Sequence, residues 1–116
     1  MIKLFSLITW NDFEKLDIRV GTVLAAEPFP QARKKAYKLK IDFGEVIGIK
    51  ASSAQITDRY TPEELEGIQV IAVINFPPKQ IATFISECLV LGIYTEDGSL
   101  VLLQPQQKTS NGLKIG

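Results

Sequence analysis

The sequence predicts an all-β protein, a closed or nearly closed antiparallel barrel whose strands are joined by turns and short helices. Three observations favour this class: several short apolar runs, glycine-containing turns between them, and only two short helix patterns. The chain has 116 residues, which is near the usual size of one domain. We therefore expect a single domain over residues 1–116.

The amino-terminal segment, residues 1–8, is apolar with an early lysine. A signal peptide would need a longer apolar core and a small-residue cleavage site, and a spanning helix would need roughly 20 apolar residues. We interpret this segment as an arm or short strand that packs on a partner subunit. We expect a cytoplasmic chain with no membrane span.

The first helix and strand follow directly. Thr9 or Asn11 can cap a short helix that runs to about Leu16. The residues from Ile18 to Glu27 are rich in Val, Ile, Leu and Ala, which predicts a long strand. Gly21 lies inside this strand, and we expect a bend or bulge there.

The second strand, residues 37–43, shows the clearest alternation in the chain. Its apolar residues alternate with Lys38, Lys40 and Asp42, so one face is buried and the other is solvated. Gly44 and Glu45 then allow a tight hairpin into a third strand at residues 46–50.

A short acidic helix is predicted at Thr61–Gly67 by its capping-box spacing, its proline at the first helical position and its final glycine. Continuous apolar runs at residues 70–74 and 89–94 predict two further strands, and a turn leads from the second into residues 100–103. A turn at Asn111–Gly112 precedes a short tail strand. Five main strands fit a Greek-key barrel of the OB type.

Composition limits the possible functions. Lys plus Arg and Asp plus Glu both total 13, whereas a dedicated nucleic-acid binder usually has a marked basic excess. The hydrophobic content of 46% is high for so small a domain, which indicates apolar surface buried in an oligomer. Cys88 is the only cysteine and there is no histidine, so disulfides within the chain, Cys/His zinc sites and the commonest general base are excluded. We expect no metal, no cofactor and no catalysis.

The most informative segment begins at Asn75, where an apolar strand ends. Pro77 and Pro78 cannot continue a central strand because each lacks an N–H donor, so the backbone leaves the sheet there. Together with Phe76 they form either a preformed apolar ledge for an extended peptide or a simple closure of the barrel end. Lys79 is either a solvated charge or a partner for a phosphate or a peptide carboxylate. We call Phe76–Lys79 the proline shelf.

Other polar residues allow two interpretations each. Asn75 can hold a turn or contact a ligand, and Ser86 and Glu87 can cap a turn, pair with surface lysines or contact a ligand. Cys88 is expected to be a small core residue. Five cations occur close together and form either a solvated face or a basic rim beside the barrel. They are Arg33, Lys34, Lys35, Lys38 and Lys40.

Several strings occur together in the order of a known family: Leu16–Gly21, Ser52–Thr57, Tyr60, Val73–Lys79 and Ser86–Gly92. From Asp12 onward the chain resembles the CsaA-like secretion chaperones, a branch of the wider group of tRNA-binding OB-fold domains appended to methionyl-tRNA synthetases. The resemblance implies an OB-fold homodimer, an export-related chaperone activity, and structure-dependent tRNA binding in the wider group. It places Asn75 beside the binding face, which favours a binding role.

The chain departs from the tRNA-binding pattern at four positions. Gln80 replaces a basic residue, Thr83 a glycine and Leu89 a methionine, and Ile85 stands where chaperone relatives can carry lysine. Loss of a cation that reaches phosphate weakens nucleic-acid binding across all sequences, so these changes favour peptide capture over tight tRNA binding.

The sequence therefore predicts an export-related chaperone that binds unfolded or precursor polypeptides, with an export ATPase as a further partner. The alternative is a free-standing tRNA-binding protein that uses the same face. An enzyme is a third possibility, but Asp17, Asp42 and Glu87 lack paired spacing for acid–base work. The predicted peptide- or tRNA-binding residues are Arg33, Lys34, Lys35, Lys38, Lys40, Ser53, Asn75, Phe76, Pro77, Pro78, Lys79, Ser86, Glu87 and Leu89.

Overall fold

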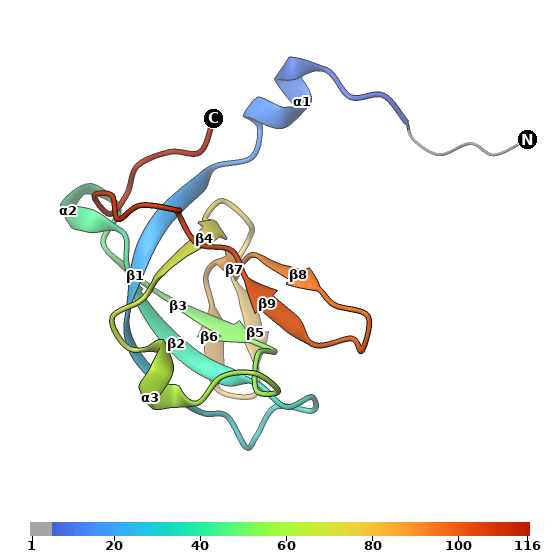
Figure 1. The fold of residues 1–116 in the computed structure, drawn as a ribbon, viewed down its shortest axis with the longest axis vertical. Helices are drawn as coiled ribbons and strands as arrows, with labels where there is room; N and C mark the ends of the chain where they lie inside the picture. Colours follow the sequence, from blue (N-terminus) through green and yellow to red (C-terminus); the bar gives the residue numbers. More distant parts are fainter. Residues whose placement is uncertain (1–5) are drawn as a thin grey trace, which may run out of the picture.

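The computed structural model describes residues 6–116 and contains a five-stranded antiparallel sheet curled nearly into a barrel (Figure 1). Its strands, in spatial order, are β3 (Ile49–Ala54), β2 (Tyr37–Asp42), β1 (Ile18–Pro28), β4 (Gln69–Val73) and β7 (Leu89–Val90). The order β4-β1-β2-β3 is that of a Greek key. The predicted all-β OB-fold barrel is confirmed.

Two hairpins form separate two-stranded sheets beside the five-stranded one. They are β5 (Lys79–Ile81) with β6 (Phe84–Ser86), and β8 (Gly92–Tyr94) with β9 (Leu100–Leu102). The second projects from the side of the barrel (Figure 1). The first was not predicted, because the adjacent prolines indicated only where the backbone leaves the sheet.

The predicted capping residues begin two of the three helices, which are α1 (Trp10–Glu14), α2 (Gly44–Ile47) and α3 (Pro62–Leu65). Thr9 caps α1 and Thr61 caps α3, each in a reciprocal capping box. In the predicted arm, residues 1–5 lie outside the described part, and residues 6–8 are exposed and belong to no strand. No helix within residues 6–116 is long and apolar enough to cross a membrane.

The expected bulge at Gly21 is wrong. The register of β1 shifts between Val23 and Ala25 instead. A Cβ added at Gly21 would lie 2.6 Å from Ile41 Cγ2 and 2.7 Å from Phe43 Cε1. Glycine is therefore needed there for close packing inside the barrel, and not for a bend.

Two further expectations need correction. The connection after β2 is not a tight hairpin, because α2 occupies residues 44–47 and β3 begins only at Ile49. The apolar run at residues 89–94 is two strands divided at Leu91. The Leu91 N–H donates to Ile71 O of β4, whereas the Leu91 carbonyl accepts from Leu103 N. The tail is not a strand of its own, although residues 112–115 pair with β1 through backbone hydrogen bonds to Val20 and Ile18.

The core fills the barrel and continues on its outside. Inside, Leu39, Ile41 and Phe43 of the β2 region are buried. A second cluster lies on the opposite face of β1 and β4, and it is formed by Ile18, Val20, Ile71 and Val73, packed against Phe13, Leu91, Leu103 and Ile115. Burial on both faces explains why β4 is a continuous apolar run.

Candidate functional site

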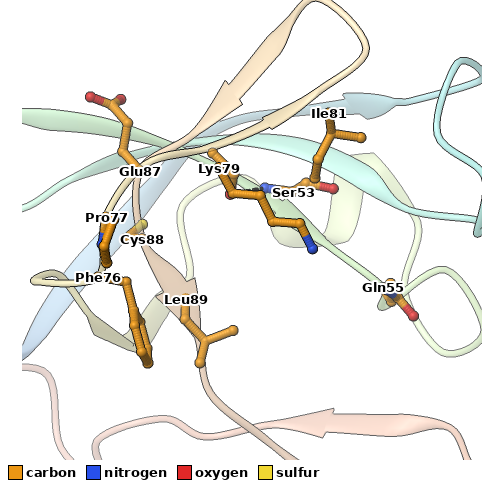
Figure 2. Close-up of a pocket in the computed structure, with 10 residues that line it drawn as sticks. Ser53, Gln55, Phe76, Pro77, Lys79, Ile81, Glu87, Cys88 and Leu89 are labelled. Atoms are coloured by element: carbon orange, nitrogen blue, oxygen red, sulfur yellow. Dashed lines mark hydrogen bonds between the residues drawn. The ribbon is translucent and has the colours of Figure 1, made fainter.

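A pocket of about 470 Å³ opens between β3, the proline shelf and the beginning of β7 (Figure 2). We call it the apolar pocket. Two of its apolar side chains are half exposed, Phe76 at 49% and Leu89 at 47%. They project in the same direction in Figure 2. The lining residues are Ser53, Gln55, Phe76, Pro77, Lys79, Ile81, Ser86, Glu87, Cys88 and Leu89.

A second pocket, of about 520 Å³, adjoins the first. The two share Ser53, Gln55, Lys79 and Ile81. We call it the basic pocket, because its described lining includes the three cations Arg33, Lys34 and Lys79 and no carboxylate. The remaining lining residues are Gln31, Ala32, Arg33, Lys34, Ala36, Gln80 and Ala82.

The side-chain amide of Asn75 is engaged within the protein. Its Oδ1 accepts from Asp17 N at 3.0 Å, and its Nδ2 donates to Lys15 O at 2.7 Å. These bonds tie the end of β4 to the connection between α1 and β1. Asn75 lines neither of the two pockets.

Ser86 and Glu87 close the barrel with their side chains. Ser86 Oγ accepts from Ser53 N at 3.0 Å, and Glu87 Oε1 accepts from Ala51 N at 2.9 Å. The Glu87 N–H donates to Ala51 O at 2.8 Å. Figure 2 shows the Glu87 side chain and the Phe76 ring extending in opposite directions. Ser86 and Glu87 both line the apolar pocket, but Ser86 Oγ and Glu87 Oε1 already accept hydrogen bonds from the backbone of β3.

The predicted basic run divides into three groups. Arg33 and Lys34 are exposed and line the basic pocket. Lys38 is only partly exposed, because its Nζ lies 3.1 Å from Glu27 Oε1 and 5.5 Å from the centroid of the Phe29 ring. Lys35 and Lys40 are exposed and line neither pocket.

Lys79 is the cation that links the two pockets, which together we call the groove. It lines both, and it forms no ion pair with any residue in the described range 6–116. Pro78 lies next to it in the chain but lines neither pocket. Gln55 and Ile81, which were not among the site residues predicted from the sequence, also line both pockets. Gln55 follows Ser53 by two positions, so the period of a strand could have identified it.

Cys88 lies in the wall of the apolar pocket and is buried. Burial away from water raises the pKa of its thiol to about 11. A neutral thiol is a poor nucleophile, so nothing here marks it as reactive. Within residues 6–116, no cluster of three or more acidic, cysteine or histidine side chains could hold a metal ion.

Comparison with protein families and structures gives consistent matches. The profile of a family described as a putative tRNA binding domain matches residues 18–114. The crystal structure of the chaperone CsaA from Bacillus anthracis is 55% identical, with a TM-score of 0.90, over 96% of this chain and 100% of that one. The CsaA chaperone protein from Picrophilus torridus is 56% identical, with a TM-score of 0.89, over 95% of this chain and 100% of that one.

Methionine–tRNA ligases are more distant relatives. The enzyme of Porphyromonas gingivalis is 39% identical and that of Chlorobium chlorochromatii 36% identical, each over 108 residues. These matches cover 93% of this chain, but the chain spans only 15% of the length of either ligase. A MetRS related protein from Pyrococcus horikoshii is 30% identical with a TM-score of 0.85, over 97% of this chain and 100% of that one.

Proposed function

The chain belongs to the putative tRNA binding domain family and to its CsaA-like branch, and from this premise we propose that it is a chaperone for unfolded or precursor polypeptides. The ligand is an extended segment whose apolar side chains enter the apolar pocket. No bond is made or broken, so the activity is binding and not catalysis.

One observation carries this proposal: the apolar pocket exposes Phe76 and Leu89, while two of its polar side chains, Ser86 and Glu87, are engaged with the protein. Ser86 and Glu87 already bond β3. A ligand therefore meets the exposed Phe76 and Leu89 side chains and the cation of Lys79, which forms no ion pair within residues 6–116. Burying apolar surface contributes about 25 cal/mol per Å² removed from water, which favours apolar side chains over phosphates at this site.

We further propose a cytoplasmic homodimer that serves protein export and passes its client to an export ATPase. Exposed apolar residues remote from the groove support pairing, since Leu7 is 97% exposed and Trp10 66%. Two grooves on one dimer raise avidity for a long client. Sedimentation should give twice the mass of one chain, and a strictly monomeric species would refute the pairing.

The second candidate function is free-standing tRNA binding. The family match and the basic pocket favour it. Against it, the chain has equal numbers of acidic and basic residues, and within residues 6–116 the cations that line the two pockets are limited to Arg33, Lys34 and Lys79.

Competition between an unfolded exported precursor and transfer RNA separates the two functions. We expect the precursor to bind and its affinity to survive added salt, whereas electrostatic tRNA binding should fall steeply with salt. Phe76→Ala should weaken precursor binding about tenfold through the loss of buried apolar area. Lys35→Ala, which removes a cation outside both pockets, is the matched control for Lys79→Ala.

Two results would contradict the proposal. Tight tRNA binding at physiological salt without competition from the precursor would establish the second function instead. Unaltered binding of both ligands in Phe76→Ala and Lys79→Ala would place the site away from the proline shelf.

A further inference from the structure

We propose that the free edge of β3 takes the bound polypeptide as an added strand, so that the groove recognises main-chain hydrogen-bonding groups as well as side chains. This inference rests on the proposed chaperone function and specifies how the ligand is held. The edge in question consists of the Ser53 carbonyl and the Gln55 N–H.

The direction of these groups follows from the sheet register. β3 is an outer strand, and it pairs with β2 along one edge only, with Ser53 opposite Lys38 and Ala51 opposite Lys40. The N–H groups of Ala51 and Ser53 bond Glu87 Oε1 and Ser86 Oγ, so they point away from β2. In an antiparallel pair, the N–H and C=O of one residue face the same edge. The Ser53 carbonyl therefore faces away from β2 too. If the same alternation continues one residue past the end of β3 at Ala54, the Gln55 N–H has the same direction.

The barrel is open at this edge. The pairings along the sheet are all antiparallel, so its two outer strands, β3 and β7, run in the same direction. In the described chain, the only backbone-to-backbone hydrogen bond across their seam joins Glu87 N to Ala51 O. Beyond it the strands diverge. Within residues 6–116 no hydrogen bond reaches the Ser53 carbonyl or the Gln55 backbone, and Gln55 is exposed. Such an edge is a template for another strand.

Every pocket along this edge shares Ser53 and Gln55. A third pocket, of about 230 Å³, lies where β3 and β7 separate, and we call it the seam pocket. Its apolar lining includes Ile56, Tyr94 and Leu100. The free edge thus borders the apolar pocket, the basic pocket and the seam pocket.

These surroundings define the class of ligand. Successive side chains of an added strand point to opposite faces, so apolar residues at every second position can enter the apolar and seam pockets. The basic pocket offers Arg33, Lys34 and Lys79 without a lining carboxylate, which complements an acidic residue of the ligand. We therefore infer an extended polypeptide with alternating apolar residues and one acidic residue. A phosphate group cannot replace the main-chain N–H of such a ligand, because phosphate offers acceptors but no donor for the Ser53 carbonyl.

The test uses a synthetic peptide that carries valine or leucine at every second position and contains one aspartate. A series of its forms, each N-methylated at a single position, is compared with it. Each N-methyl group removes one N–H donor and leaves the side chains unchanged. Fluorescence anisotropy should show about tenfold weaker binding when methylation removes the donor to Ser53, the equivalent of one lost hydrogen bond. Methylation at positions that face away from β3 should leave the affinity within about twofold, as expected where no hydrogen bond is lost.

The protein side is tested by Gln55→Pro with Gln55→Ala as the matched control. Proline removes the N–H at position 55, and the preceding residue, Ala54, is already in a strand, which is the conformation that proline favours there. We expect about tenfold weaker peptide binding for Gln55→Pro than for Gln55→Ala, because both variants lose the Gln55 side chain but only proline also removes the N–H. In the wild type, bound peptide should slow hydrogen exchange of the Gln55 amide.

The possible outcomes are distinguishable. Equal binding of all methylated peptides, with no protection of the Gln55 amide, overturns strand addition while leaving polypeptide binding intact. Failure of the unmethylated peptide and of an unfolded precursor to bind overturns the chaperone function itself. Self-association lost in Gln55→Pro would assign the edge to a second copy of this chain. Should Gln55→Pro fail to fold, the methylated series alone decides.

Discussion

Asn75 joins two segments that are far apart in the sequence. Its amide accepts from Asp17 N and donates to Lys15 O, and both partners are main-chain groups. A polar side chain at the end of a strand is compatible with a turn or with ligand binding, and its type alone does not distinguish the two. Here its two bonds provide a structural role, and ligand contact stays a prediction.

Replacing Asn75 by alanine should lower the free energy of unfolding by about 1–2 kcal/mol, because two main-chain groups lose their partner. Urea unfolding measures this. Gln106→Ala is the control, since Gln106 is exposed and its side chain makes no hydrogen bond within residues 6–116. A loss of peptide affinity without a loss of stability would instead indicate direct ligand contact.

The buried thiol of Cys88 makes the stability of the folded protein depend on pH. Burial raises the pKa of its thiol from 9.0 to about 11. The folded state therefore holds the proton more tightly than the unfolded state, so this contribution to stability is complete below pH 9 and is lost as the pH rises to about 11. Alkylation with iodoacetamide at pH 8 should be much slower in the native protein than in urea. Equal rates would show that the thiol is accessible and not buried.

At the scale of elements, the β5–β6 hairpin builds the groove, since it contributes Lys79 and Ile81 to both main pockets. An edge-to-face contact between Phe84 of the hairpin and Phe29 holds the hairpin in place, with the two ring centroids 5.3 Å apart. Its turn carries Ala82 at a φ of +53°, in the left-handed region that favours glycine.

Ala82→Gly should therefore stabilise the protein by about 1 kcal/mol, because glycine adopts that φ without the steric cost of a Cβ. Thermal unfolding measures the effect. Ala25→Gly provides the comparison, since Ala25 is exposed in β1 and has no positive φ; there glycine should destabilise. A lower melting temperature for Ala82→Gly would refute the strain.

For the whole molecule, closure of the barrel depends on side chains. Where β3 approaches the chain leading into β7, Glu87 and Ser86 supply acceptors that backbone carbonyls would otherwise provide. This incomplete ladder leaves the edge beyond Ser53 open. Global stability and ligand binding thus depend on adjacent parts of one seam.

Glu87→Ala should lower the free energy of unfolding by about 1–3 kcal/mol, because the Ala51 N–H is left without an acceptor. Glu87→Gln keeps an oxygen at the same position and should retain most of the stability. Denaturant titration of both variants is the measurement. If glutamine were as harmful as alanine, the negative charge and not the hydrogen bond would be the important feature.

Much of the architecture could be predicted from local patterns. Alternation identified β2, a capping residue identified α1 and a capping-box spacing identified α3. Continuous apolar runs identified β4 and β7. These signals depend on neighbours in the chain. They could not locate the bulge beside Leu24 or the break at Leu91, because both depend on which distant strand accepts each backbone bond.

For the site, the sequence by itself determined that apolar residues and a cation follow β4 at the proline shelf. Only the tertiary structure decided which groups face a ligand. It brought Phe76, Leu89 and Lys79 to one groove with Arg33, Lys34 and Gln55, and it engaged Asn75, Ser86 and Glu87 within the protein. The reason is physical: a polar side chain is available to a ligand only if no main-chain group has taken its hydrogen bonds, and those partners lie far away in the chain.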